Sequence, residues 1–80
     1  MVAVTEIIEL IRNEVLTEDV EIAEDTNLFS TGFLDSLQLT TMFLSLEQHY
    51  QVTIGIFDVS QEKFDTPAQI AHWVNTVHND

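Results

Sequence analysis

The chain has 80 residues, with 14 acidic and two basic side chains, a formal net charge of −12 and no cysteine. Such a charge repels phosphate backbones and anionic lipid surfaces, which argues against nucleic-acid binding and membrane insertion. The lack of cysteine excludes a disulfide framework and cysteine-bound zinc. Neither an 18-residue apolar run nor a signal peptide is visible, so we expect a cytoplasmic monomer. Hydrophobic residues make up 45% of the chain, enough for one core, so residues 1–80 are predicted to form a single domain.

The first predicted element is an amphipathic helix over about residues 3–16. Its apolar residues fall at positions i, i+3, i+4, i+7 and i+11, with polar residues between them. They are Val4, Ile7, Ile8, Ile11 and Val15. From Thr17 to Asp35 this periodicity gives way to acidic residues with scattered apolar ones. That stretch predicts a long loop held down by its own apolar side chains.

A second helix is predicted from Ser36 to Tyr50, where the chain has no proline or glycine. Its apolar stripe consists of Leu39, Met42, Phe43, Leu46 and Tyr50. Asp35 and Gln38 stand three residues apart, the spacing of a reciprocal cap at a helix start. Asp35 would then be the cap and Ser36 the first helical residue.

The side of this helix that faces away from the stripe is uncharged and partly apolar, which is unusual. The residues concerned are Leu37, Thr40, Thr41, Leu44 and Gln48, rimmed by Gln38 and Glu47. We call this set the docking strip. One explanation is a helix buried on both sides, and the other is an exposed surface on which a partner docks.

Residues 51–64 are ambiguous, because Val52, Ile54 and Ile56 alternate as in a β-strand. A lone strand would have no partner for its backbone groups, and Gly55 would weaken it. We therefore predict an extended loop, followed by a single helical turn through Phe64 that Ser60 would cap.

The last helix has the clearest start. Thr66 is placed as its cap, Pro67 as its first residue, and Gln69 completes a capping box. Its predicted buried stripe is Ile70, Trp73, Val74 and Val77. The expected fold is all-α, a small bundle of three to four helices with a long loop between the first and second.

Metal sites are not expected. The acidic run at Asp19 lacks the glycine that a calcium loop needs at its sixth position. His72 and His78 are six residues apart, so on a helix they diverge by about 120° and make poor joint ligands. Trp73 fits a core position better than a binding site.

Ser36 needs a chemical explanation of its own. Asp35 and Ser36 are both common at helix starts, so a plain cap is one interpretation. A serine oxygen at a helix N-terminus is also well placed to carry an anion such as a phosphodiester, because free N–H groups and the helix dipole stabilise it. A hydrolase nucleophile is the weakest interpretation, since no G-x-S-x-G elbow and no histidine in the preceding loop supply a base.

The run "GFLDSLQLTTMFLSLEQHY", with the long loop before it and "FDTPAQI" after it, resembles the acyl carrier proteins over essentially the whole chain. The signature is Asp35, Ser36 and Leu37, with Gly32 three residues before Asp35. The resemblance implies that Ser36 receives 4′-phosphopantetheine from coenzyme A through a separate, Mg²⁺-dependent phosphopantetheinyl transferase. The thiol of that arm would carry an acyl or aminoacyl thioester, delivered by a loading ligase and passed to downstream acyl- or aminoacyl-transferring enzymes. The chain itself would hold no catalytic residue.

Two departures from the family pattern narrow the expectation. Carriers of fatty-acid synthesis have acids directly after the signature. In this chain the first acid after Leu37 is Glu47. Peptidyl carrier domains more often have G-G-x-S, from which Phe33, Leu34 and Asp35 depart. The run "IFDVSQEKFDTPAQI" is similar to stand-alone D-alanyl carriers and to discrete carriers of specialised pathways, including secondary metabolism. We therefore expect a discrete carrier of that kind; a fatty-acid carrier and an acidic adaptor or inhibitor without a prosthetic group are the alternatives.

Overall fold

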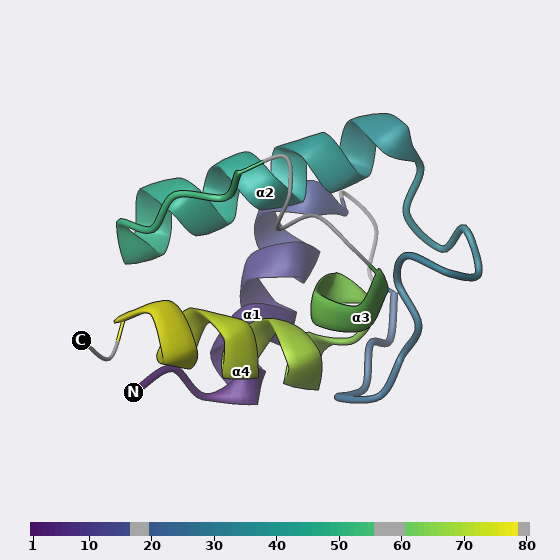
Figure 1. The fold of residues 1–80 in the computed structure, drawn as a ribbon. Coiled ribbons are helices and arrows are strands. Elements are labelled where there is room, and N and C mark those ends of the chain that lie inside the picture. The colour runs from purple at the N-terminus through teal and green to yellow at the C-terminus, as the bar shows by residue number, and fades with distance from the viewer. Residues whose placement is uncertain (17–19, 56–60, 79–80) are drawn as a thin grey trace.

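The computed structural model describes residues 1–16, 20–55 and 61–78, and all side chains in these ranges except those of residues 61, 62 and 78. The helical elements are α1 (Val4–Leu10), η1 (Ile11–Val15), α2 (Ser36–Tyr50), α3 (Gln61–Phe64) and α4 (Pro67–His78). The described residues contain no β-strand. Figure 1 shows α2 and α4 on either side of the short α3, with α1 behind them and the long loop along one edge. The predicted all-α bundle is confirmed.

The first predicted helix is present, but its second half is wider than an α-helix. α1 begins at Val4 and runs directly into the π-helical turn η1, in which Leu16 N–H donates to Ile11 O at 2.8 Å. Leu10 is buried, although the predicted stripe omitted it. The reason is that α4 packs against α1 while α2 packs against η1, so the buried sector is broader than one stripe.

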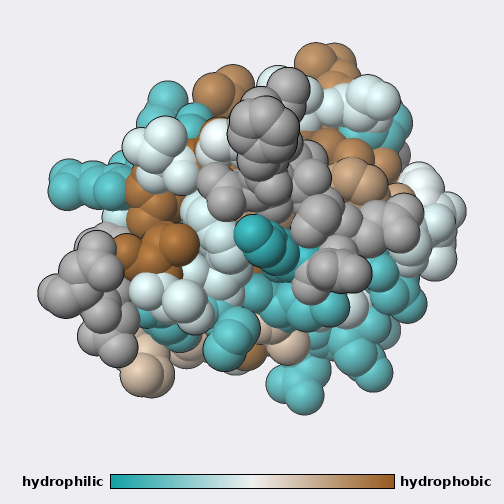
Figure 2. Space-filling model, viewed as in Figure 1, coloured by the Kyte–Doolittle hydropathy of each residue, from teal (hydrophilic) through white to brown (hydrophobic). Residues whose placement is uncertain are grey.

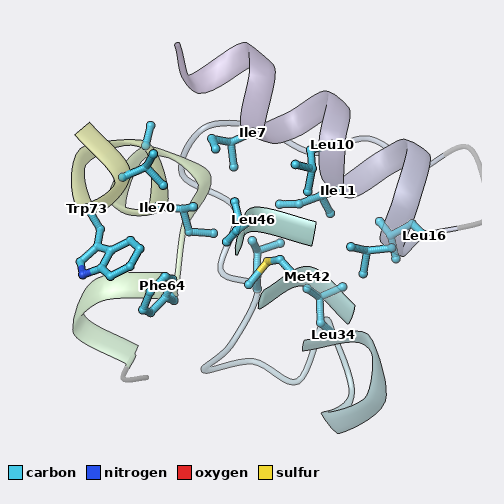
Figure 3. Packing of buried hydrophobic residues seen from close by; sticks show 14 residues of the cluster. Ile7, Leu10, Ile11, Leu16, Leu34, Met42, Leu46, Phe64, Ile70 and Trp73 are labelled. Atoms are coloured by element: carbon cyan, nitrogen blue, oxygen red, sulfur yellow. The ribbon is translucent and has the colours of Figure 1, made fainter. Parts of the chain in front are cut away.

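One hydrophobic core joins all the helices and the long loop (Figure 3). Its buried members are Ile7, Leu10, Ile11, Val15, Leu16, Leu28, Leu34, Met42, Leu46, Phe64, Ile70, Ala71, Trp73 and Val74. Three aromatic rings connect α2, α3 and α4, since the Phe64 centroid lies 5.2 Å from that of Phe43 and 5.0 Å from that of Trp73. Both distances are typical of favourable edge or tilted aromatic pairs. The prediction of Trp73 as a core residue is confirmed.

The predicted stripe of the last helix is wrong at Val77, which is 39% exposed. Val77 lies in the last turn of α4, where it lines two surface hollows instead of entering the core. The cap of α4 is as predicted: Gln69 N–H donates to Thr66 Oγ1 at 3.1 Å, and Thr66 N–H donates to Gln69 Oε1 at 3.0 Å.

The described part of the segment after α2, residues 51–55, is a loop, as predicted. Residues 52–55 form no strand and run back along α2 (Figure 1), where Ile54 N–H donates to Glu47 Oε2 at 2.8 Å. The helical turn through Phe64 is also present as α3. Ile56, Ser60 and Asp19 lie outside the described residues.

The C-terminal end of α2 is tied to the first helical segment by two polar contacts. His49 Nε2 contacts Glu14 Oε2 in an exposed pair, a type of contact that adds little stability. Burial, followed by the charge and hydrogen bond of Glu6 and the charge of Glu14, raises the pKa of Tyr50.

One carboxylate at the α3–α4 junction makes four hydrogen bonds to the long loop, and Ala68 N–H of α4 donates a further one to Glu24 O at 3.0 Å. Asp65 Oδ1 accepts hydrogen bonds from the N–H groups of Phe29 and Ser30 at 3.0 and 2.9 Å. Its Oδ2 accepts from Asn27 Nδ2 and Ser30 Oγ, both at 2.9 Å. The backbone oxygen of Asp65 accepts from Leu28 N–H at 2.6 Å. We call these contacts the Asp65 clamp.

The clamp perturbs the Asp65 carboxyl group itself. Partial burial acts to raise its pKa, but the hydrogen bonds from Ser30, Phe29 and Asn27 together outweigh burial and lower it. A lowered pKa in the folded state means that the ionised carboxylate stabilises the fold.

We expect Asp65→Asn to lower the free energy of unfolding by about 1–2 kcal/mol at pH 7, because it removes charge-assisted hydrogen bonds. The difference from wild type should stay constant down to about pH 5, above the unfolded-state pKa of about 3.9. It should shrink as the pH falls through the lowered folded-state pKa. Urea unfolding between pH 7 and pH 2 measures this. Asp25→Asn, which removes an exposed charge, is the control, and equal behaviour of the two variants would contradict the clamp.

Candidate functional site

The start of α2 is fixed by the predicted capping box. Gln38 N–H donates to Asp35 Oδ1 at 2.8 Å, and Asp35 N–H donates to Gln38 Oε1 at 2.9 Å. Asp35 has extended backbone angles, so α2 begins at Ser36. Two of the polar groups that a helix start leaves unpaired are thereby satisfied within four residues.

The three residues before the cap form a turn that enters the core. Gly32 has φ +75°, a conformation that glycine adopts at little cost. Leu34 is 2% exposed, and its N–H donates to Leu28 O at 3.0 Å. Phe33, between them, is 37% exposed. The buried leucine therefore holds the chain directly before Asp35, and the glycine lets it turn there.

Ser36 itself is exposed at the first position of a 15-residue helix. Its hydroxyl makes no hydrogen bond with another residue in the described ranges. The first turn of α2 contains no acidic residue, so the helix dipole acts on this position without a competing charge inside the turn. The arrangement can accept a covalently attached anion, because the capping box leaves the serine oxygen unused.

The hydrolase interpretation requires a base beside Ser36. The structure describes the side chains of two histidines, His49 and His72, and shows neither in contact with Ser36. His49 is 13 residues further along α2, which corresponds to about 20 Å along the helix axis, and it contacts Glu14. His72 lines a surface hollow of about 610 Å³ on α4 together with Lys63 and Trp73. Within the described ranges no group of three or more His, Cys, Asp or Glu is positioned to hold a metal ion.

Most of the docking strip is exposed, which excludes the first of its two explanations, a helix buried on both sides. Leu37 is 75% exposed and Leu44 is 53% exposed, so α2 is not buried on both sides. Thr40 Oγ1 donates to Ser36 O at 2.9 Å and Thr41 Oγ1 donates to Leu37 O at 3.0 Å. Because both hydroxyls bond back to the helix, the strip is less polar than its composition suggests. Figure 2 shows separate hydrophobic residues at the upper edge, over α2, with more polar residues between them, whereas hydrophilic residues gather at the lower right, over the long loop.

The rim of the strip makes contacts within the chain. Gln38 belongs to the capping box, and the Glu47 carboxylate accepts the hydrogen bond from Ile54 described above. Glu47 and His49 are the only residues of α2 from the Asp, Glu, Lys, Arg and His set, and both have partners within the chain. The helix beside Ser36 therefore offers a partner one carboxylate, Glu47, which lies eleven residues from the serine and already accepts a backbone N–H.

Asp65 is a residue of this region that the sequence patterns did not identify. One signal was available: Thr66 already caps α4, so the acid before it had no local task. Its partners are 35 to 38 residues away in the sequence, and no local pattern specifies them.

Among the described residues, no helix is long and apolar enough to cross a membrane.

Comparison with known proteins identifies a family that matches most of the chain. The family model described as "Phosphopantetheine attachment site" matches residues 5–74.

The curated relatives point the same way. The D-alanyl carrier protein of Lactobacillus acidophilus is 30% identical over 70 residues, covering 88% of this chain and 89% of the relative. That of Streptococcus mutans is 27% identical over 75 residues, covering 94% of each chain. The lincomycin biosynthesis protein LmbN of Streptomyces lincolnensis is 35% identical over 63 residues, which are 79% of this chain and 22% of that protein. The chain is thus similar to carrier proteins along nearly its whole length.

Asp35 and Ser36 should respond differently to replacement by alanine. Asp35→Ala removes the cap and is expected to lower the free energy of unfolding by about 1 kcal/mol. Ser36→Ala removes a hydroxyl without a partner among the described residues, so the change should stay within about 0.5 kcal/mol. Urea unfolding at pH 7 measures both. If Ser36→Ala destabilised the protein as much as Asp35→Ala, the serine would have a structural role and the assignment of a free hydroxyl would fail.

Proposed function

The chain belongs to the acyl carrier protein family, whose prosthetic group is 4′-phosphopantetheine, and we propose that Ser36 is the residue that bears this group. The observation that carries the proposal is the exposed Ser36 hydroxyl at the first position of α2, next to a capping box that leaves it unused. The matched residues 5–74 include this position.

The residues at this position fit a phosphodiester. The N-terminal end of α2 contributes the positive end of the helix dipole and backbone N–H groups that lie within its first turn. The nearest carboxylate, Asp35, accepts the Gln38 N–H at 2.8 Å, so its charge is partly compensated. Exposure of Ser36 leaves room for a second protein to reach its oxygen.

The modification requires chemistry that this chain does not supply. The Ser36 oxygen forms a bond to the phosphorus of coenzyme A that carries the pantetheine, the bond from that phosphorus to the adenosine bisphosphate breaks, and the hydroxyl proton passes to a base of the transferase. Mg²⁺ held by the transferase stabilises the leaving group. Once attached, the arm supplies a thiol that forms thioesters, which a chain without cysteine cannot do by itself.

In this proposal the protein is a substrate of other enzymes and a carrier between them, not an enzyme. Its similarity to D-alanyl carrier proteins and to a lincomycin biosynthesis protein supports a discrete carrier of aminoacyl or acyl groups in a specialised pathway. A phosphopantetheinyl transferase, a loading ligase and downstream group-transferring enzymes are the partners. Its expected location is the cytoplasm.

We further propose that these partners dock on the docking strip. Leu37 and Leu44 are seven residues apart, which is almost two helical turns and about 10 Å along the axis. Because the rotation nearly closes, both side chains lie on the same side of α2. An enzyme with an apolar surface beside its active-site entrance would bury these exposed side chains and gain free energy from them. A surface that relies on Arg or Lys contacts to this helix would find only one carboxylate, Glu47, far from Ser36 along the helix.

Incubation of the purified protein with coenzyme A, Mg²⁺ and a broad-specificity phosphopantetheinyl transferase should add one phosphopantetheine, observed by intact-mass spectrometry. Ser36→Ala should abolish the addition, because it removes the attacking oxygen. Thr53→Ala, which removes an exposed hydroxyl outside α2 and outside the loop before it, should still be modified. No mass change in wild type with a transferase that modifies a known carrier would refute the proposed function.

The uncharged strip should discriminate against enzymes of fatty-acid synthesis. We expect their malonyl transferase to load the modified protein at least tenfold less efficiently than a fatty-acid carrier, measured as kcat/KM. Thr40→Glu combined with Thr41→Glu should recover part of the difference. Asn13→Glu combined with Thr53→Glu adds the same charge at exposed positions outside α2 and should leave the rate within twofold. Equal gains in the two variants would show that net charge, not the strip, sets the preference.

A further inference from the structure

We propose that Asp65 is a positioning residue for the modification of Ser36, an inference that rests on the proposed function. The Asp65 clamp holds residues 27–30 against the α3–α4 junction. These residues lead through one turn into the capping box of α2. The carboxylate thereby sets how the loop in front of Ser36 is presented to the transferase.

The hydrogen bonds that the Asp65 carboxylate accepts all come from residues of the long loop. Each of its oxygens accepts two hydrogen bonds, which uses the full acceptor capacity of a carboxylate. All four donors belong to three consecutive or nearly consecutive loop residues, Asn27, Phe29 and Ser30. The start of α4 does not need Asp65, because Thr66 and Gln69 cap that helix reciprocally.

From the clamp to the serine, the chain is connected by short-range contacts. Gly32 N–H donates to Phe29 O at 3.4 Å, and Leu34 N–H donates to Leu28 O at 3.0 Å. Leu28 and Leu34 are both buried in the core, so they attach the two ends of the turn to the core. Asp65 fixes the same turn at its polar side, and Asp35 follows directly after it.

The part of the turn that these contacts leave exposed lies next to Ser36 in the chain. Residues 30–33 are all exposed, and Phe33 presents 37% of its surface. We call residues 30–33 the ledge. A transferase that reaches Ser36 approaches the ledge together with the N-terminal end of α2. If the ledge samples other conformations, only the competent fraction binds, and the apparent affinity falls by that fraction. Loss of the clamp should therefore raise KM more than it lowers kcat.

The test measures phosphopantetheinylation kinetics with the unmodified protein as the varied substrate, coenzyme A and a broad-specificity transferase. Asp65→Asn is expected to raise KM about three- to tenfold and to leave kcat within twofold. Ser30→Ala removes one of the four hydrogen bonds and should raise KM less, and it provides a second variant if Asp65→Asn folds poorly. Asp25→Asn controls for the lost charge. Ile7→Val, a fully buried change in α1, controls for lower global stability.

Amide hydrogen exchange gives a readout that does not depend on the transferase. In Asp65→Asn the amides of Phe29 and Ser30 should lose protection, while those of Met42 and Leu46 in α2 keep it. An unchanged KM in a variant that has lost this protection would overturn the proposal. So would an equal rise of KM in Ile7→Val or Asp25→Asn. If the transferase did not modify the wild-type protein at all, the proposed function would be overturned. That result is distinct from one in which the wild type is modified and Asp65→Asn has the same KM.

Discussion

The structure depends on how a long loop is ordered in a small protein. The described loop residues 20–35 contain no helix or strand, and ordering each residue costs about 1–2 kcal/mol of backbone entropy. Two buried leucines, Leu28 and Leu34, attach the loop to the core from one side. The Asp65 carboxylate attaches it from the other with four hydrogen bonds. A loop fixed on both sides can hold a neighbouring helix start in one position.

The helix start divides structural and chemical tasks between adjacent residues. Asp35 and Gln38 satisfy each other's backbone N–H groups, so the local fold needs nothing from Ser36. If Ser36 bears the prosthetic group, as we propose, this division lets the serine accept a bulky group without loss of the helix that positions it. Further along α2, in the docking strip, the Thr40 and Thr41 hydroxyls are likewise occupied, because both donate to the helix backbone.

The features that the sequence predicts well are local ones. Both capping boxes follow from residues three apart, and the positions of α2, α3 and α4 follow from helical spacing and capping signals. Features set by distant partners were missed or wrong. Leu10 is buried because two other helices cover the first segment, Val77 is exposed because the last turn of α4 extends past the core, and Asp65 pairs with residues 35 to 38 positions away. Such outcomes depend on the assembled fold, which periodicity along one element does not encode.

The row of aromatic rings across α2, α3 and α4 has a spectroscopic consequence. Trp73 is the only tryptophan of the chain, it is 7% exposed, and its ring packs on Phe64 of α3, which in turn packs on Phe43 of α2. Any movement of α3 relative to α2 and α4 changes the surroundings of this one indole. The protein thus contains its own fluorophore at the point where three helices meet, and its emission reports their packing without an added label.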